Sequence, residues 1–340
     1  MSEPIRASDV EQLAVTTRNG FVENRFFGSA VVVGPDGGMI ASVGDPAAGV
    51  YPRSALKPLQ AIAALRCGAQ LTGEQLALAC GSHVGSQQHQ DIAATVLADA
   101  GLNAEDLGCP AVYPSSAAQV ARAALQVAPL PLERSPLAHN CSGKHAGFLS
   151  ATVAAGEDPH NYLRPDAAVQ SEVLAVLEQY CQTSITQVGV DGCGAPTPVM
   201  SLTSLARGFG ALGRAVTDRG AELPAAMAAR AMLDYPTAVQ GDKRPDTVIL
   251  ESLELIVKTG ADGIVAVGAP DGTAVAVSMI DSTHRATHLV ALVLLANFAP
   301  AALPVDAMRD VVEQIVPPVY GGGQPVGGVK VAPAVLQLLS

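Results

Sequence analysis

Apolar and polar positions divide the chain into a strand-rich beginning, a helix-rich middle and a strand-rich end. Short runs rich in Val, Ile and Thr predict strands. The turn Gly34-Pro35-Asp36-Gly37-Gly38 joins two of these runs into a hairpin, and Asp271-Gly272 joins two more near the end of the chain. The predicted strands are 13–17, 28–33, 39–43, 186–190, 263–268 and 274–280.

The segments between the hairpins are longer, are bounded by glycine or proline, and predict helices. The predicted helices are 54–67, 72–80, 88–100, 116–127, 145–155, 165–182, 201–218, 222–233, 246–257 and 284–299, followed by a tail rich in Pro and Gly. This order predicts an α+β fold in which strands from both ends of the chain form one antiparallel sheet packed with helices. We expect a single domain over 1–340, with a sheet part at roughly 1–50 and 258–340 and a helical part at roughly 54–257.

Composition narrows the class of protein. Of the 340 residues, 49% are hydrophobic and 15% are charged, so we expect a large core rather than disorder. The formal net charge of −11 argues against nucleic acid or an anionic membrane as a partner. No apolar run reaches the length of about 18 residues that a membrane-spanning helix needs. The first residues lack an export signal, so we expect a cytoplasmic protein with reduced cysteines.

The stretch 51–60 reads Tyr-Pro-Arg-Ser-Ala-Leu-Lys-Pro-Leu-Gln. Ser54 and Lys57 are three residues apart, so a helix that opens at Ser54 places both on one face. A neutral lysine amine can take the proton of a serine hydroxyl, and burial or the adjacent Arg53 cation would lower the lysine pKa. Ser-x-x-Lys is an acyl-transfer signature of β-lactamases and penicillin-binding proteins. The alternative is a serine that caps a helix, followed by a solvated lysine.

Two further motifs extend this pattern. Ser82, in Gly81-Ser82-His83-Val84-Gly85, would relay a proton or act as the alternative nucleophile; otherwise it is a helix cap. The neighbouring His83 is an acid, base or substrate-binding candidate whose commoner role is structural. Lys258 opens Lys-Thr-Gly, another penicillin-recognising signature, and its alternative is a lysine at the end of a helix over 253–257. The companion Ser-Asp-Asn signature is absent, which argues against a β-lactamase or transpeptidase as such.

Two cysteines lie in loops dense in polar residues. Cys141 is central in His-Asn-Cys-Ser-Gly-Lys-His at 139–145, and Cys193 lies in Asp-Gly-Cys-Gly at 191–194. Two thiolates from separate loops can hold zinc with one more protein ligand and a water. The remaining ligand is left open among His139, His145 and Lys144. The alternative is two buried thiols that pack as small hydrophobic side chains.

Taken together, these stretches resemble the asparaginase II family, the rhizobial-type or class 3 L-asparaginases. The matching runs follow one another along nearly the whole chain, and five in series are specific where each alone is weak. They are the decapeptide at 51–60, Cys-Gly-Ser-His at 80–83, His-Asn-Cys-Ser-Gly-Lys-His-Ala-Gly at 139–147, Asp-Gly-Cys-Gly-Ala-Pro at 191–196 and Lys-Thr-Gly-Ala-Asp-Gly at 258–263. The last departs from the family's Lys-x-Gly-Ala-Glu-Gly, since Asp262 stands in place of Glu.

The resemblance implies hydrolysis of L-asparagine to L-aspartate and ammonia by a homodimer, with a fold similar to serine β-lactamases and Ser-x-x-Lys glutaminases. It implies two catalytic pairs, one of Ser54 with Lys57 and one of Ser82 with Lys258. The positions implied for zinc are Cys141, Lys144 and Cys193. The positions implied near the substrate are Arg53, Asp191 and His145.

Two other readings remain open at this point. The first is another Ser-Lys amidohydrolase, either a glutaminase or an enzyme that recognises β-lactams. The second is a binding or regulatory protein that keeps an amino-acid pocket without turnover, a reading that the intact Ser, Lys and Cys positions disfavour.

Overall fold

The computed structural model describes residues 3–115 and 133–339, so the helix predicted at 116–127 lies outside the described residues. The described residues combine helices with an antiparallel sheet, which confirms the predicted α+β class. Among them, no helix is both long and apolar enough to cross a membrane.

The main sheet is assembled from the two ends of the chain, as predicted. Its strands follow the order β11-β12-β1-β2-β10-β9-β8, all neighbours are antiparallel, and β3 also pairs with β2. Two small sheets, β4 with β7 and β5 with β6, lie apart from it. The strands are β1 (Glu11–Arg18), β2 (Phe21–Val33), β3 (Met39–Val43), β4 (Gly49–Val50), β5 (Val188–Val190), β6 (Pro196–Pro198), β7 (Met200–Ser201), β8 (Ile256–Thr259), β9 (Ile264–Gly268), β10 (Ala274–Met279), β11 (Val319–Gly321) and β12 (Gln324–Val331).

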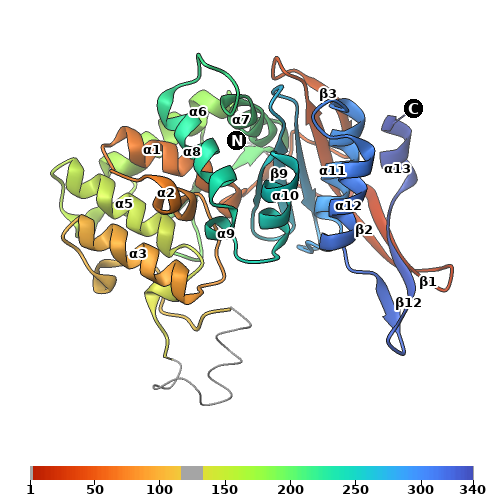
Figure 1. The fold of residues 1–340 in the computed structure, drawn as a ribbon. Coiled ribbons are helices and arrows are strands. Elements are labelled where there is room, and N and C mark those ends of the chain that lie inside the picture. Colours follow the sequence, from red (N-terminus) through yellow and green to blue (C-terminus); the bar gives the residue numbers. More distant parts are fainter. Residues whose placement is uncertain (1–2, 116–132, 340) are drawn as a thin grey trace.

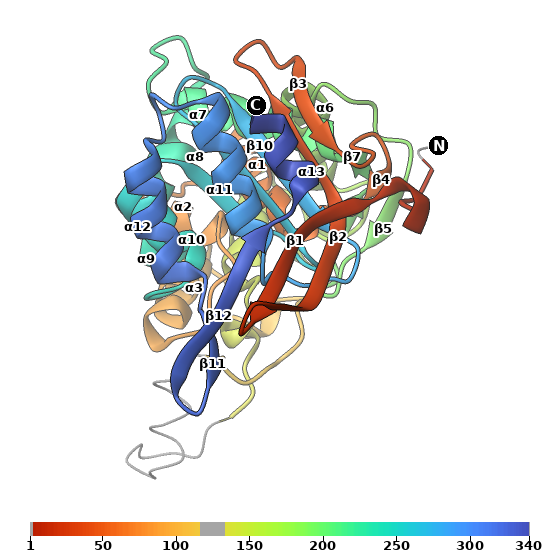
Figure 2. The same ribbon diagram turned by 90° about the vertical axis from the view of Figure 1, so that its right-hand side faces the viewer.

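Helices cover the sheet on both faces (Figure 1). Helix α7 packs on β9 and β10 from the side of the helical part, and α11 packs on the same strands from the other side. Both strands are therefore buried along their whole length, which explains why their sequences, apart from Ser278, are apolar on both faces rather than alternating. Figure 2 shows that the β11–β12 hairpin projects beside β1 at the far edge.

The helices are mostly those expected, with shifted ends. They are α1 (Lys57–Arg66), α2 (Gly73–Ala79), α3 (Gln87–Asp99), α5 (Ser142–Ala154), α6 (Ala168–Cys181), α7 (Leu202–Ala215), α8 (Leu223–Asp234), α9 (Pro236–Val239), α10 (Pro245–Leu253), α11 (Thr287–Phe298), α12 (Val305–Ile315) and α13 (Pro333–Leu336). Short 3₁₀ helices add η1 (Ala7–Asp9), η2 (Arg53–Leu56), η3 (Ala104–Asp106), η4 (Pro136–Ala138), η5 (Pro159–Asn161) and η6 (Gln337–Leu339).

One expectation about the helices was wrong. The helix predicted over 246–257 ends at Leu253, because Glu254 adopts a left-handed backbone with φ of 51°, and the apolar run after it becomes strand β8. Lys258 therefore lies in a strand and not at the end of a helix. The tail beyond 299, for which no individual element was predicted, contains α12, the β11–β12 hairpin and α13.

The expected helix at Ser54 begins as the 3₁₀ turn η2, and α1 starts at Lys57. Proline explains this start, because Pro58 has no N–H to donate to the carbonyl of Ser54 as an α-helix beginning there requires. The backbone N–H of Lys57 instead donates to Ser54 in the tighter three-residue pattern. Helix α1 is buried from Lys57 to Ala64 and packs against α5, α6 and α8 at the centre of the helical part.

Candidate active site

Lys57 lies at the buried start of α1 and has no exposed surface. Its Nζ is 2.6 Å from the carbonyl oxygen of Gly81, 2.9 Å from that of Asn140 and 2.9 Å from Ser82 Oγ. Burial lowers the pKa of this amine, while the negative charge of the Cys141 thiolate opposes the shift. As a neutral amine, Lys57 would donate its two N–H bonds to the two carbonyls and turn its lone pair toward the Ser82 hydroxyl.

Backbone contacts fix the loop that carries Ser82, between α2 and α3. The N–H of Ser82 donates to the carbonyl of Val239 at 2.7 Å, and the N–H of Val84 donates to that of Gln240 at 3.0 Å. A Cβ on Gly81 would lie 2.4 Å from the Val239 oxygen, so only glycine permits this approach. The glycine noted in the sequence thus presents its carbonyl to Lys57.

Ser54 is half-buried on η2 and its hydroxyl makes no hydrogen bond within the part of the chain that the structure describes. Strand β8 packs against this turn, and a Cβ on Gly260 would lie 2.7 Å from the Pro52 carbonyl. The close approach brings the strand of Lys258 beside the turn of Ser54. The structure therefore brings the two expected serine–lysine motifs together, although the hydrogen bond that it forms joins Lys57 to Ser82. Which serine works with which lysine stays a prediction.

Lys258 is also fully buried. Its Nζ donates to the carbonyl of Thr259 at 2.6 Å and lies 3.6 Å from Asp246 Oδ2. Burial lowers the pKa of Lys258 to about 8, although Asp246 acts in the opposite direction, and the charge of Lys57 lowers it further. Two buried amines with depressed pKa values thus lie in one region, an arrangement typical of catalytic sites.

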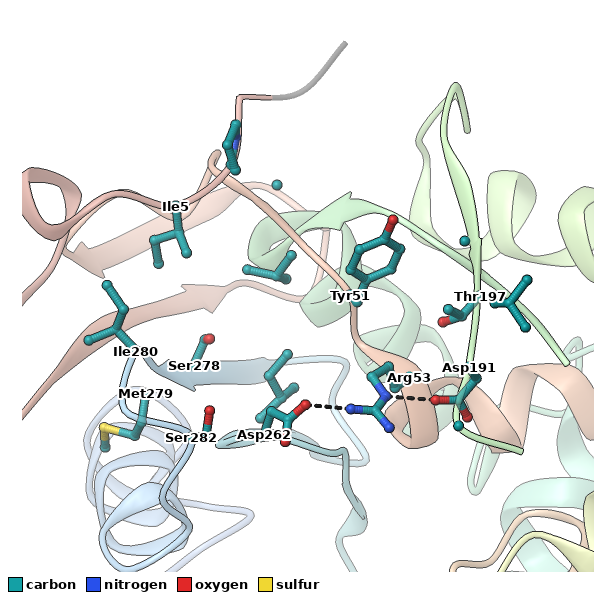
Figure 3. A pocket seen from close by; sticks show the side chains of 17 residues that line it. Ile5, Tyr51, Arg53, Asp191, Thr197, Asp262, Ser278, Met279, Ile280 and Ser282 are labelled. Atoms are coloured by element: carbon teal, nitrogen blue, oxygen red, sulfur yellow. Dashed lines mark hydrogen bonds and ion pairs between the residues drawn. The ribbon is translucent and has the colours of Figure 1, made fainter. Parts of the chain in front are cut away.

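Arg53 is held between two carboxylates (Figure 3). Its Nε donates to Asp191 Oδ1 at 2.6 Å, and its Nη1 donates to Asp262. The Asp191 side chain is 8% exposed and that of Asp262 is 65% exposed, so the second partner is far more accessible to solvent. The backbone φ of Arg53 is 49°, in the left-handed region that side chains rarely adopt. Such strain is common where a structure must aim one side chain at a ligand.

An open pocket of about 590 Å³ adjoins Arg53. Figure 3 shows Arg53, Asp191 and Asp262 along one side, with Tyr51 and Ile280 among the other walls. Ser54, Lys57, Ser82 and Lys258 do not line this pocket. Its connection to them is Arg53, which precedes Ser54 in the chain and faces the pocket.

The two cysteines singled out in the sequence also meet. Sulfur atoms of Cys141 and Cys193 and a carboxylate oxygen of Asp191 all lie within 4.8 Å of one another. Lys144 Nζ donates to Cys193 Sγ at 3.1 Å, and Cys193 Sγ lies 3.2 Å from Asp191 Oδ2. Cys141 precedes α5 and Cys193 lies in the turn between β5 and β6, so two separate elements supply this cluster.

The two cysteines of this cluster have pKa values that are shifted in opposite directions. The Cys193 thiol lowers the pKa of Cys141 well below its usual value, and Lys57 and Lys144 act in the same direction against burial. The Cys141 thiolate in turn raises the pKa of Cys193. Burial lowers the pKa of Lys144, but the two cysteines and Asp191 outweigh it and raise the value overall. The cluster is therefore a thiolate neutralised by a buried ammonium.

The two histidine candidates lie against this region. His83 Nδ1 accepts from the N–H of Gly85 at 3.1 Å, so its Nε2–H donates to Ser142 Oγ at 3.0 Å, and both ring nitrogens are engaged within the protein. His145 Nδ1 lies 2.6 Å from Tyr162 Oη, whereas its buried Nε2 has no partner among the described residues. Burial lowers the pKa of His145 well below its usual value, so the ring is neutral.

Sequence reasoning missed two residues of this region. Asp262 was noted only as a departure from a family motif, and its pairing with Arg53 across 209 residues leaves no local signal. Asp246 lies in the first turn of α10 after Pro245, where an acidic residue is readily explained by the helix dipole. Its contact with Lys258 appears only in the folded chain.

Comparisons with known proteins agree with the resemblance seen in the sequence. The model of the family described as L-asparaginase II matches residues 14–331, which confirms that expectation. No curated protein matches the chain. Among solved structures, a β-lactamase from Mycobacterium bovis is 15% identical with a TM-score of 0.36, over 85% of this chain and 95% of that one. A protein named Mglu is 13% identical with a TM-score of 0.34, over 84% of this chain and 63% of that one.

Proposed function

Since the chain belongs to the L-asparaginase II family, we propose that it hydrolyses the side-chain amide of L-asparagine to give L-aspartate and ammonia. The observation that supports this proposal most is the meeting of Lys57 with Ser82 beside the turn of Ser54 and the strand of Lys258. The direct test is ammonia release from L-asparagine, with L-glutamine as the competing substrate. Release from glutamine alone would replace the asparaginase proposal by a glutaminase.

We assign nucleophilic attack to Ser54, a half-buried residue whose hydroxyl makes no hydrogen bond with another described residue. Ser54 Oγ attacks the amide carbon and passes its proton to Ser82, which passes its own proton to neutral Lys57. The hydrogen bond between Ser82 and Lys57 supports this relay. The C–N bond then breaks as the amide nitrogen takes a proton from the Lys57 ammonium and leaves as ammonia. Water then attacks the Ser54 ester as Lys57 accepts one of its protons, and Lys57 returns that proton through Ser82 to Ser54 Oγ as the ester bond breaks and L-aspartate leaves.

We assign to Lys258 the role of a second, charged amine that keeps Lys57 neutral. As an ammonium it opposes protonation of Lys57, because two positive charges in one buried region repel each other. Its pKa of about 8 means that this charge is present below pH 8 and is lost above it. Once this charge is lost, Lys57 binds a proton more readily, so less of it is in the neutral form that acts as the base. We therefore expect the rate of ammonia release to fall as the pH rises through about 8.

We propose that Arg53 binds the α-carboxylate of the substrate, because a guanidinium binds a carboxylate through two parallel hydrogen bonds. The exposed Asp262 is the partner that a substrate carboxylate would replace, while the buried Asp191 keeps the guanidinium in place and faces the α-ammonium. The negative charge of Asp262 thus competes with the substrate for the same donor.

Arg53→Lys should raise the KM for L-asparagine about 10-fold or more, with a smaller change in kcat. Lysine keeps the charge and the left-handed backbone strain but loses the two-pronged geometry, so substrate binding is the step affected. Asp262→Asn should leave KM unchanged or lower it, because it weakens the competing pair. Steady-state kinetics of both variants, with Arg164→Lys as an exposed control, measure the difference. An unchanged KM in Arg53→Lys would remove this assignment.

The cysteine cluster fits zinc, because two sulfur atoms, an amine and a carboxylate oxygen gather within reach of one ion. Cys141, Lys144 and Cys193 would hold it, with Asp191 beside them. Bound there, zinc would supply positive charge that orients polar groups of the substrate. Without it, the Lys144 ammonium balances the Cys141 thiolate, so binding must displace the proton of Lys144.

Protein purified without chelators should contain about one zinc per chain, and Cys193→Ser should lose most of it because a serine hydroxyl is a poor zinc ligand. Cys67→Ser, at a half-buried cysteine outside the cluster, should keep its metal and serves as the control. Elemental analysis of the three proteins measures the content. Equal zinc in Cys193→Ser and the parent would place the metal elsewhere, and full activity of a metal-free parent would separate the metal from turnover.

A further inference from the structure

Asp246 is a fully buried carboxylate that joins three elements. Its Oδ2 accepts from the backbone N–H of Thr259 at 2.9 Å, and its Oδ1 accepts from Thr259 Oγ1 at 2.5 Å, which ties α10 to the end of β8. His288 Nε2, on α11, lies 3.3 Å from the same Oδ1. Burial alone would raise the pKa of Asp246, but His288, Lys258 and Thr259 outweigh burial and hold it far below its usual value. The group is therefore a carboxylate at every working pH.

The carboxylate faces the amine of Lys258 from α10 at 3.6 Å, and neither side chain is exposed. Other ionisable groups act on Lys258 from the elements packed around it. They are Lys57 on α1, Cys80 at the end of α2, Cys141 before α5 and His284 in the loop before α11. His288, in the first turn of α11, contacts Thr259 and Asp246 beside it. Within the described residues, Asp246 is the sole acidic side chain that forms an ion pair with Lys258.

The same residue is connected to the loop of Ser82. The backbone N–H of Asp246 donates to Gln240 Oε1 at 2.8 Å. The carbonyl of Gln240 accepts from Val84, and the carbonyl of Val239 next to it accepts from Ser82. One chain of hydrogen bonds therefore runs from α11 through Asp246 to the loop that faces Lys57.

We propose that Asp246 is a positioning residue for Lys258. The Asp246 carboxylate fixes the end of β8 against the Ser82 loop and serves as the counter-ion of the buried Lys258 ammonium. The inference rests on the proposed function for its effect on turnover. Its effect on Lys258 itself does not depend on which substrate the enzyme uses. The carboxylate touches neither the assigned nucleophile nor the pocket at Arg53, so it acts through Lys258.

The test compares Asp246→Asn with Thr247→Val in protein labelled with ¹³C at the ε-carbon of lysine. Asparagine keeps the shape and an acceptor for Thr259 but removes the charge. The Lys258 signal, assigned by its loss in Lys258→Met, should titrate near pH 8 in the parent protein. It should titrate about one pH unit lower or more in Asp246→Asn, because the ammonium has lost its counter-ion. The neighbouring Thr247 is equally buried and bonded, to Gly241 and Pro236, so its variant should titrate like the parent.

Turnover supplies the second readout. In Asp246→Asn the decline of ammonia release at high pH should begin about one pH unit lower, with KM unchanged at low pH. Unchanged titration of Lys258 in Asp246→Asn, or an equal shift in Thr247→Val, would overturn the proposal. If Asp246→Asn does not fold, titration of the parent protein decides. Titration of Lys258 at about pH 5–6, the range of a buried lysine without a partner, would show that no counter-ion offsets its burial and would contradict the proposal. A shifted Lys258 in a parent protein that releases no ammonia would overturn the proposed function and leave this inference standing.

Discussion

Ser54→Ala should fold like the parent protein and lose nearly all ammonia release from L-asparagine, by roughly 10⁴-fold or more. The residue removed is the assigned nucleophile, and no general acid or base can replace the bond that it forms to the substrate carbon. Folding should be preserved because the Ser54 hydroxyl makes no hydrogen bond to another described residue and alanine fits a 3₁₀ turn. Activity together with the thermal unfolding midpoint separates loss of chemistry from loss of structure.

Two companions sharpen this experiment. Ser82→Ala should slow turnover by about 10²-fold or more, because it removes the relay to Lys57 while the nucleophile stays. Ser86→Ala removes a half-buried serine that caps α3, and it should cost about 1 kcal/mol of stability with activity retained. Mass spectrometry of enzyme quenched during turnover should find the β-aspartyl adduct on the peptide of Ser54. An adduct on Ser82 would make Ser82 the nucleophile in place of Ser54. Near-full activity in Ser54→Ala would show that Ser54 is not the nucleophile.

Lys57→Met should lower kcat by about 10²- to 10⁴-fold, the contribution expected of a general base. Methionine has a similar length and no charge, so it fills the buried site at the start of α1. It leaves the carbonyls of Gly81 and Asn140 without their donor, at a cost of roughly 1–3 kcal/mol for each. Removal of a buried amine offsets part of that cost. Lys330→Met, on the exposed strand β12, is the matched control and should retain parental activity.

The measurement for Lys57→Met is kcat as a function of pH. The parent should lose activity toward low pH as Lys57 gains a proton, and this limb should be missing from the residual activity of the variant. A small primary amine added to Lys57→Ala should restore part of the rate, because the truncated side chain leaves room beside Ser82. Parental kcat in Lys57→Met would assign the base to another residue, and the buried Lys258 would be the next to test.

The sequence predicted the local elements of the fold better than the contacts between them. The hairpin around Asp271-Gly272 was predicted because its turn and its two strands are neighbours in the chain. Strand β8 was read as helix, because a short continuous apolar run has no period and Glu254 reverses the chain without a glycine. Strand β12 was missed, since Gly327 and Gly328 give it little β-propensity. The segment forms a strand because it hydrogen-bonds to β1, a contact that is distant in the sequence.

The candidate site was predicted in its residue types but not in its pairings. Spacing within a helix suggested that Lys57 would meet Ser54, and the hydrogen bond goes instead to Ser82 on another loop. Cys141 and Cys193 were grouped because both loops are dense in polar residues and because both match motifs of the family, and the structure places them together. The pairings of Arg53 with Asp262 and of Lys258 with Asp246 depend on the approach of β8 to its neighbours, which no local pattern encodes.

The antiparallel pairing of Gly28 with Met279 has a consequence for synthesis on the ribosome. Strand β2 emerges early, but its partner β10 is translated only about 250 residues later, and β12 follows later still. During that interval the nascent amino-terminal strands keep unpaired edges, which favour wrong association with other chains. Production yield should consequently depend on chaperones and on temperature during translation more than the stability of the finished enzyme would suggest.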